Sequence, residues 1–516
     1  MRAGTAAGAV TAALVATLVA GPLVAVFLRA EITSPLGPAD WAAVRFTLVQ
    51  AVISALLSVV LAIPLARALA RRRFPGRTLL IALMGAPFIL PTIVAVLGLL
   101  AVFGRAGLLS QGLGLFGFAP VRIYGLHGIV LAHVFFNLPL ATRLILQGWL
   151  SVPAERFRLA ASLGLSARDI NRLIERPILR ATLPGAFLVV FLVCTTSFAV
   201  ALALGGGPRA TTVELAIYQA FTFDFDLDRA ARLATVQFAI AAVAALAAFR
   251  LARLAAFGGG LDRPVERWDA RTPGARARDA VLIVAAAAFL LLPLAMIVAR
   301  GLPALPGLPP VIWQAALRSL AVALASALLA TLAALAIAVA VQRLARNLGA
   351  VVEGAGYLAL AVSPLVIGIG LFILVFPVAS PQALALPVTA VVNALMSLPF
   401  LLRALVPALA ETEARFGPLA DSLGLGGSAR LRILLLPRLR RPLGFSMGLA
   451  AALSMGDLGV VALFAPPGGG TLPLELYRLM GAYRMGDAAG AALLLLGLSL
   501  ALFWLFDRGG RADART

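Results

Sequence analysis

Few ionisable side chains of this chain lie inside its apolar runs, where they could take part in a reaction or bind a ligand. Asp457 lies inside the apolar run LAAALSMGDLGVVALF, residues 449–464. An ionisable group within such a run is costly to bury, so it is expected to face a cavity or a partner. A carboxylate in that position suits a cationic ligand. The alternative is that Asp457 lies near the end of the run, pairs locally and never meets a ligand, and the sequence leaves both open.

The other polar residues do not indicate a catalytic site, a metal site or a nucleotide-binding site. His127 and His133 have no evident third ligand nearby, so they are more consistent with hydrogen-bonded packing than with a metal site. A P-loop needs a lysine that reaches the phosphates, and the sequence contains no lysine. The pattern GLGLFG at 112–117 lacks the strand–helix context of a dinucleotide site. We therefore expect no catalytic residue, no metal and no cofactor bound by this chain.

The composition is typical of a membrane protein. Hydrophobic residues make up 62% of the 516 residues and charged residues 13%, whereas roughly 45–50% of an ordinary globular chain is apolar. The formal net charge is +21, but the arginines cluster in short segments between apolar runs and form no basic stripe of the kind that binds nucleic acid. We therefore expect the lipid bilayer, and not nucleic acid, as a partner.

Twelve apolar runs could cross a bilayer, since a spanning helix needs about 20 mostly apolar residues. They cover roughly residues 6–28, 43–66, 79–103, 126–149, 182–204, 230–249, 279–299, 313–341, 355–376, 384–406, 442–464 and 486–506. The first run is longer than the apolar part of a signal peptide, about 7–15 residues, so we expect it to be a retained span. The sequence therefore predicts an all-α polytopic membrane protein.

Charge alternates between the segments that join these runs. Arginine is concentrated at 67–78, 150–181, 250–279 and 407–441, whereas the segment 205–229 is acidic. Cytoplasmic loops of membrane proteins carry the excess of positive charge. We therefore expect the four arginine-rich segments and both chain ends on the cytoplasmic side. The three acids of FDFDLDR (223–229) can offer carboxylates to a cation or to a protein partner, and they also suit a plain solvated loop, which we favour.

The chain repeats itself at a spacing of 260 residues. The segment SLGL occurs at 162–165 and again at 422–425, and FNLPLATR (136–143) matches MSLPFLLR (396–403). Self-similarity at a fixed offset is typical of a duplicated structural unit. Because six spans separate the copies, both units are expected to have the same orientation in the membrane.

A linker divides the two units. The segment 257–278 is rich in glycine, proline and charge, and such a composition is typical of a boundary between domains. We predict a first half at 1–256 and a second half at 279–516, each with six spans.

Each SLGL segment lies between the fourth and fifth spans of its half. In the first copy Leu159, Leu163, Ile170 and Ile174 recur at multiples of about four residues, which predicts a helix with one apolar stripe. A helix of this kind outside the membrane needs a surface to cover the stripe. That surface is either the protein's own loops, as in an ordinary connector, or the groove of a partner.

Glycine and proline divide the repeated segment in the same way in both copies. Gly164 and Gly424 can break the helix or allow a close approach of the backbone. Pro177 and Pro437 mark the start of the next span. The pattern predicts a short helix, a glycine turn and a second helix, presented twice to the cytoplasm.

These segments resemble the cytoplasmic signature of ABC importer permeases, which runs Glu-Ala-Ala, three residues, Gly, nine residues, Ile-x-Leu-Pro. Arg158 and Pro418 occupy the first, acidic position, so neither copy has the carboxylate that could form a salt bridge to an ATPase there. The resemblance implies two loops that dock ATPase subunits through the positions Ala160, Ala161, Gly164, Ile174, Pro177, Ala420, Gly424, Leu434 and Pro437.

Four further stretches are similar to the thiamine and thiamine pyrophosphate ABC importer permeases, in which two six-span halves are fused. They are RRRFPGR (71–77), GLHGIVLAHVFFNLPLATRLILQ (125–147), GGGPRATTVELAIYQA (205–220) and SMGDLGVVALF (454–464). The resemblance implies a bacterial inner-membrane permease that works with two copies of a separate ATPase and a periplasmic binding protein. ATP then acts on the partner subunit. Ferric-iron permeases are the nearest alternative, and an ion-coupled secondary transporter is an alternative from another class.

The substrate path is expected to pass Asp457. Its counterpart at the repeat spacing is Ser197, so the path would be asymmetric. Pro91 and Pro364 lie within the third and ninth runs, where kinked helices could shape the path or pack without further role.

Overall fold

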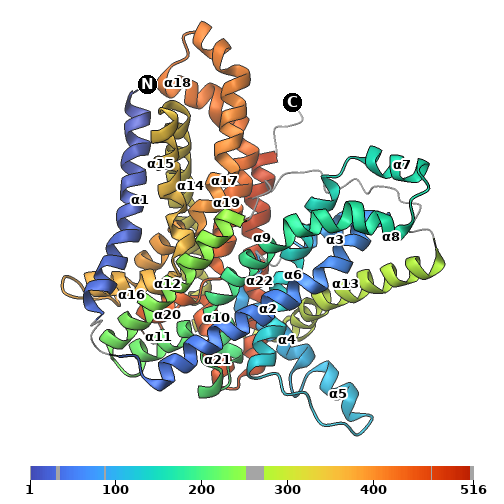
Figure 1. Ribbon diagram of the computed structural model, residues 1–516. Helices are drawn as coiled ribbons and strands as arrows, with labels where there is room; N and C mark the ends of the chain where they lie inside the picture. The colour runs from blue at the N-terminus through green and yellow to red at the C-terminus, as the bar shows by residue number, and fades with distance from the viewer. Residues whose placement is uncertain (1, 31–34, 86–88, 252–271, 467, 512–516) are drawn as a thin grey trace.

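The computed structural model describes residues 2–30, 35–85, 89–251, 272–466 and 468–511 (Figure 1). Within these ranges all regular structure is helical. Eleven helices are long and apolar enough to cross a membrane, or up to 12 if one bent pair counts as a single span. This confirms the predicted all-α polytopic fold. The spanning helices include the predicted runs 43–66 and 384–406, although each of these contains an arginine, Arg45 or Arg403.

The first half runs from α1 to α12. Its helices are α1 (Arg2–Arg29), α2 (Pro38–Arg71), α3 (Arg77–Leu83), α4 (Thr92–Phe103), α5 (Leu108–Gly114), α6 (Leu126–Leu150), α7 (Ala154–Ser162), α8 (Ala167–Ile170), the π-helix η2 (Asn171–Glu175), α9 (Arg176–Thr195), α10 (Phe198–Leu204), the short 3-10 helix η3 (Pro208–Ala210), α11 (Val213–Thr222) and α12 (Leu227–Leu251). The segment 205–229, predicted as a loop, thus contains the helix α11, and α12 begins at Leu227 within the acidic stretch 223–229.

The second half repeats this order. Its helices are α13 (Pro273–Gly301), the 3-10 helix η5 (Leu302–Gly307), α14 (Pro310–Arg343), α15 (Arg346–Tyr357), the 3-10 helix η6 (Leu358–Ala361), α16 (Pro364–Val375), α17 (Ala385–Ser422), α18 (Gly427–Ala429), the π-helix η7 (Arg430–Leu435), α19 (Leu436–Met455), α20 (Gly459–Phe464), α21 (Leu472–Gly481) and α22 (Met485–Arg511). The fourth span and the start of the arginine-rich segment 407–441 are one helix here, whereas Pro153 separates α6 from α7 in the first half.

Four predicted spans are interrupted near their middle. The breaks separate α3 from α4, α9 from α10, α15 from α16 and α19 from α20. The pair α15–α16 bends by 97°. Pro91 precedes α4 and Pro364 opens α16, because proline lacks the N–H that would continue a preceding helix.

Side chains from neighbouring helices satisfy the backbone at the α9–α10 break. Gln50 Nε2 on α2 donates to the carbonyl of Cys194 at 2.9 Å, and Gln237 Nε2 on α12 donates to the carbonyl of Thr195 at 2.9 Å. An unpaired carbonyl inside a bilayer is costly, so an interruption needs such partners.

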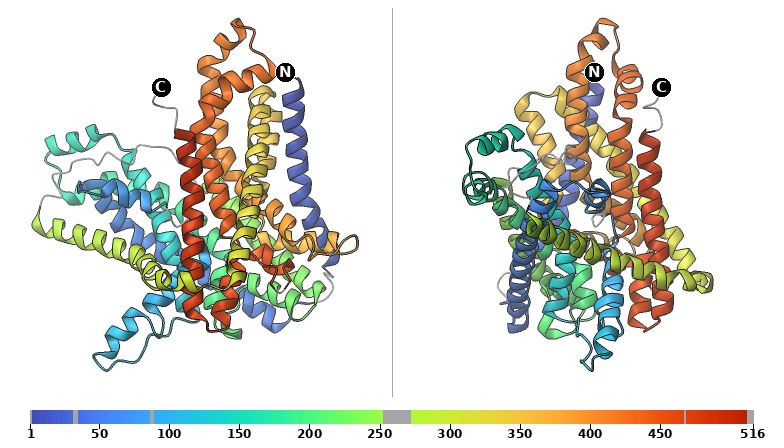
Figure 2. Two further views of the ribbon diagram at one scale, coloured as in Figure 1. Left: turned by 180° about the vertical axis from the view of Figure 1, so that it is seen from behind. Right: turned by 90° about the vertical axis from the view of Figure 1, so that its right-hand side faces the viewer.

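The two halves exchange their first helices. Helix α1 packs against α14, α15 and α16 of the second half, and α13 packs against α2 and α4 of the first (Figures 1 and 2). The halves therefore interlock. The predicted linker stays a prediction, because residues 257–271 lie outside the described ranges and Pro273 already begins α13.

The repeated segments project from the bundle on the side where both chain ends lie. Figure 1 shows the start of α1, the end of α22 and α18 at the top, and α7 and α8 at the right, below the level of α18, while α5, α11 and α21 lie towards the bottom. This arrangement agrees with the predicted grouping of arginine-rich segments and chain ends. Their orientation relative to the cytoplasm stays a prediction.

Candidate translocation cavity and docking loops

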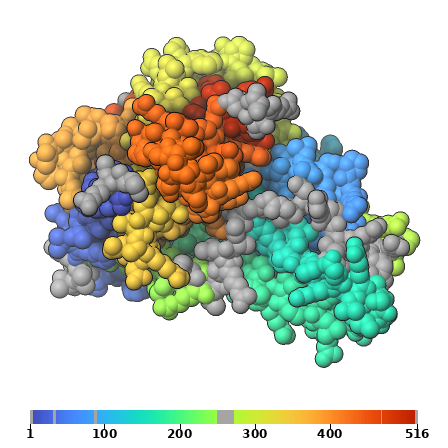
Figure 3. All heavy atoms as spheres, turned by 90° about the horizontal axis from the view of Figure 1, so that it is seen from above, coloured from blue at the N-terminus to red at the C-terminus, as the bar shows by residue number. Residues whose placement is uncertain are grey.

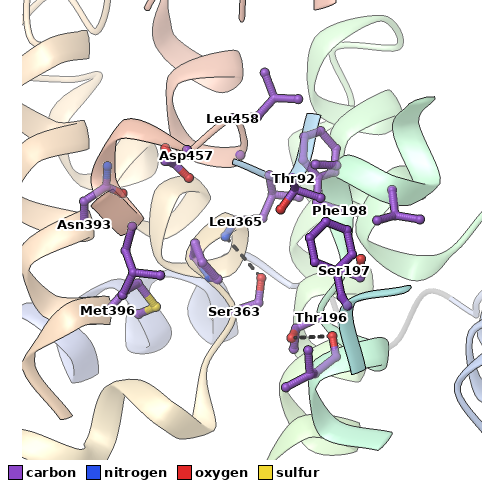
Figure 4. A pocket seen from close by; sticks show the side chains of 18 of the residues that line it. Thr92, Thr196, Ser197, Phe198, Ser363, Leu365, Asn393, Met396, Asp457 and Leu458 are labelled. Atoms are coloured by element: carbon purple, nitrogen blue, oxygen red, sulfur yellow. Dashed lines mark hydrogen bonds between the residues drawn. The ribbon is translucent and has the colours of Figure 1, made fainter. Parts of the chain in front are cut away.

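A cavity of about 470 Å³ lies where the four interrupted spans meet. Pro91, Ser197, Pro364 and Asp457, the residues predicted for the substrate path, all line it (Figure 4). Each of the four lies at or beside a helix break, one break in each interrupted span. The structure therefore brings these residues together, although their role in transport stays a prediction.

Asp457 occupies the break between α19 and α20. Its carboxylate faces the backbone N–H groups at the start of α20, and the amide of Asn393 lies beside it. Asn393 Nδ2 also donates to Ser454 Oγ at 3.0 Å. The oxygen Oδ2 of Asp457 is buried without a hydrogen-bond partner among the described residues. Local capping and exposure to the cavity, which the sequence left as alternatives, thus occur together.

The first half presents different groups at the same places. Ser197 opens α10, next to Thr196, whose Oγ1 donates to the carbonyl of Leu192 at 3.2 Å. His133 lies opposite the break and its Nδ1 is 3.3 Å from Ser54 Oγ. It is buried and bonded, as predicted for a packing residue. The cavity is therefore asymmetric despite the repeat.

Glu214 is the lining residue that the sequence prediction missed. It lies on α11, is 0% exposed, and lines the cavity, yet neither carboxylate oxygen has a hydrogen-bond partner among the described residues. Helix α11 is fixed by Thr212, which accepts from Leu215 N–H, and by Thr47, which accepts from Val213 N–H at 2.8 Å. The segment TTVELAIYQ (211–219) resembles TLPLELYRL (471–479) of the second half, and such a match is a signal for a structural element at this place.

The lining is acidic and aromatic. Glu214 and Asp457 contribute carboxylates, and no arginine is among the described residues that line the cavity, although the chain has a net charge of +21. Phe136, Phe198 and Phe400 contribute ring faces and edges. A cavity lined by one sign of charge within low-dielectric walls concentrates the opposite charge, so the site suits an organic cation.

The two SLGL segments fold as predicted, each as a helix, a glycine turn and a second helix. Gly164 has φ +64° and Gly424 has φ +65°. Beyond each glycine, Leu165 N–H donates to the carbonyl of Ala160 at 3.0 Å, and Leu425 N–H donates to that of Ala420 at 2.9 Å. This hydrogen bond from beyond a left-handed glycine is the usual way to end a helix sharply.

The predicted apolar stripe divides into two faces. Ile170 is buried against Phe157 and Ala160, whereas Leu159 and Leu163 point outward. The prediction of one stripe was wrong because the turn at Gly164 reverses the chain and places the two parts on different faces.

Both loops expose the same three apolar positions, 260 residues apart. The exposed fractions are 60% and 58% for Leu159 and Leu419, 65% and 66% for Leu163 and Leu423, and 60% and 63% for Leu173 and Ile433. We call these six residues the exposed leucine positions. Figure 3 shows the two segments as separate protrusions on the face seen from above.

The docking residues predicted from the signature fall into three groups. Ala161, Gly164, Pro177, Gly424 and Pro437 are exposed, and Ile174 and Leu434 are half-buried. Ala160 and Ala420 are buried, so they support the loops from inside.

Different ion pairs brace the two loops. Glu175 accepts from Arg67 Nε at 3.0 Å, which ties η2 to α2. In the second loop Arg430 pairs with Glu413 and, at 2.5 Å, with Asp421. The loops therefore share a backbone shape and an apolar surface but not their internal charges.

Two interlocked helical halves that break their spans around an interior site form the architecture of a membrane permease, which carries a solute through the bilayer. The comparisons with known proteins narrow this class. The chain is 41% identical over 515 residues to the thiamine transport system permease protein ThiP of Brucella abortus (strain 2308), with 97% of this chain and 94% of the relative covered. The chain belongs to this family of thiamine transport permeases.

Two enterobacterial relatives agree with this result. The chain is 42% identical over 484 residues to the protein of the same name from Escherichia coli (strain K12), covering 91% of this chain and 89% of the relative. It is 41% identical over 487 residues to that from Salmonella typhimurium (strain LT2), covering 92% and 90%. No family model matches the chain.

Proposed function

We propose that this chain is the membrane subunit of an ATP-driven importer and carries thiamine, and its phosphates, inward through the central cavity. The observation that supports the substrate most directly is the pair of carboxylates, Glu214 and Asp457, in a cavity whose described lining residues include no arginine. Thiamine contains a thiazolium ring with a permanent positive charge, which complements such a lining. Relatives that match almost the whole chain are named for thiamine transport.

Two copies of an ATP-hydrolysing subunit bind the permease, one at each repeated loop. The exposed leucine positions support this assignment, because a matched apolar surface on two loops needs two matching grooves to cover it. The chain contains no lysine and therefore no P-loop of its own, so the energy comes from those partners. Closure of the two ATPase copies would move the loops and alternate access to the cavity.

A periplasmic binding protein delivers the solute at the opposite end, where α5, α11 and α21 lie (Figure 1). Both chain ends and the arginine-rich segments then face the cytoplasm of a cell with an inner membrane. Ferric iron as the substrate is not favoured, since the relatives that match nearly the full chain are named for thiamine. Ion-coupled transport would not need two repeated docking loops.

Competition uptake tests the function. Proteoliposomes that contain the permease, its ATPase and the binding protein are supplied with labelled thiamine, with and without ATP, and with thiamine pyrophosphate or ferric iron as competitors. We expect ATP-dependent uptake that thiamine pyrophosphate reduces and ferric iron does not. Uptake that needs an ion gradient and no ATP, or that follows iron alone, would contradict the proposal.

A further inference from the structure

Glu214 lacks the counter-charge that a buried carboxylate requires. Its exposed fraction is 0%, and no cationic side chain among the described residues pairs with it. The neutral side chains of Ser363 and Gln237 approach its carboxylate, and the amide nitrogen of Gln237 also donates to the carbonyl of Thr195. A buried ion without a partner is strongly destabilising, so the carboxylate needs either a proton or a cation that enters the cavity to neutralise it.

The second half contains a buried glutamate that is neutralised by a side chain of the protein itself. Helix α21 takes the place of α11, because Leu472 N–H donates to Ser319 as Val213 N–H donates to Thr47, both at 2.8 Å. Helix α21 also has a buried glutamate, Glu475, which pairs with Arg478 at 2.5 Å.

The two glutamates occupy different positions in their helices. Glu214 is the second residue of α11 and lines the cavity, whereas Glu475 is the fourth residue of α21 and is not among the lining residues. One half therefore neutralises its glutamate with an arginine. The other half directs its glutamate at the cavity and leaves it unpaired.

Other groups around the cavity fit the same ligand. Asp457 approaches from the second half with one buried, unpaired oxygen. Phe198 stands at the start of α10, beside Ser197 (Figure 4). The volume of about 470 Å³ falls within the roughly 300–1,000 Å³ of small-molecule sites.

We propose that Glu214 is the principal binding residue for an organic cation in transit, with Asp457 as a second carboxylate and Phe198 as an aromatic contact. This inference rests on the proposed function, under which the cation is thiamine. The quaternary nitrogen of a thiazolium ring has no N–H to donate. Carboxylates and aromatic faces are therefore the groups that can stabilise it out of water.

Equilibrium binding to the permease–ATPase complex in nanodiscs tests this site. The probes are labelled thiamine and a neutral isostere in which a thiophene ring replaces the thiazolium. We expect the wild-type complex to bind thiamine at least 10-fold more tightly than the isostere. Glu214→Gln should raise the Kd for thiamine at least 10-fold, which is about 1.4 kcal/mol, and leave the Kd for the isostere unchanged.

Two further variants control for structure. Glu475→Gln changes a buried glutamate that is already paired, and Glu214→Asp keeps the charge. We expect wild-type discrimination between the probes in the first and partial discrimination in the second. Glu214→Gln removes a buried charge at constant size, so its thermal stability should equal or exceed that of the wild type.

The inference is overturned if Glu214→Gln binds thiamine as the wild type does, or if the wild-type complex binds no thiamine or does not distinguish the cation from the isostere. Failure of the proposed function gives a different result, because wild-type proteoliposomes would then show no ATP-dependent thiamine uptake at all.

Discussion

Arg71 on α2 and Asp279 on α13 join the two halves through a pair of hydrogen bonds of 2.8 and 2.5 Å, with both side chains nearly inaccessible to solvent. Arg72 adds a third bond to the same carboxylate at 2.6 Å. Asp279 is therefore the shared partner of two arginines at the place where α13 packs against the first half. This carboxylate links the interlocked first helix of the second half to α2.

Asp279→Asn should destabilise the protein strongly. Removing one partner of a buried ion pair leaves an uncompensated charge and costs about 3–5 kcal/mol, and here two arginines lose their anion. Thermal unfolding of the purified protein in detergent measures the effect as a lowered Tm. Asp487→Asn is the control, since its pair with Arg484 is partly exposed, at 27% for Asp487 and 53% for Arg484, and such a pair contributes roughly 0–1 kcal/mol. Equal Tm values for the two variants would contradict the assignment.

Replacing Gly164 and Gly424 together by valine should abolish transport and weaken co-purification of the ATPase. A Cβ at either position meets no atom within 4 Å, so the effect comes from the left-handed backbone, which costs a residue with a side chain roughly 1–2 kcal/mol.

Gly426→Val is the matched control for that double variant. Gly426 lies in the same loop with equal open space but has φ −117°, which valine adopts readily. Normal uptake in the double variant would refute a docking role for the loops, and loss of function in Gly426→Val alone would show that bulk, not backbone conformation, matters there.

Leu163→Asp combined with Leu423→Asp should weaken binding of the ATPase to the permease. Both side chains are about two-thirds exposed, at 65% and 66%, so the fold loses little packing, while an apolar interface would acquire two charges. Pull-down of the ATPase should fall at least about 10-fold, equal to about 1.4 kcal/mol. Leu115→Asp, at an 86% exposed position after α5, should leave the pull-down unchanged. Equal retention of the ATPase in both variants would exclude these leucines from the interface.

Asp457→Asn should reduce thiamine uptake and leave ATPase binding intact. The carboxylate lines the cavity, whose lining includes no residue of the two repeated loops, and an amide keeps its size while removing its charge. Initial uptake rates in proteoliposomes and a parallel pull-down measure the two effects separately. Unchanged uptake kinetics would remove Asp457 from the substrate path.

The sequence predicted the parts of the protein that depend on local pattern. The apolar runs predicted the spans, because any apolar helix long enough to cross the hydrocarbon core is stabilised in the bilayer. Gly164 and Gly424 marked the turns correctly, since a left-handed residue is a local requirement that glycine meets without strain. The repeat at 260 residues also identified Ser197 as the counterpart of Asp457, and both line one cavity.

These local patterns did not predict the contacts between segments that are far apart in the sequence. An apolar run has no feature that tells a straight helix from one interrupted at Thr196 or Gly456, because the freed carbonyls are satisfied by side chains such as Gln237 from another helix. The exposure of Leu163 and the burial of Ile170 likewise depend on how the chain turns back on itself.

The sequence by itself thus determined the membrane class, the duplication and the two glycine turns, since hydropathy and backbone preference act residue by residue. Only the tertiary structure decided that α1 and α13 cross between the halves, that four helix breaks meet at one cavity, and that Glu214 lies there unpaired while Glu475 is neutralised by Arg478. Whether a carboxylate has a partner depends on which helices surround it, and that is fixed by packing between segments far apart in the chain.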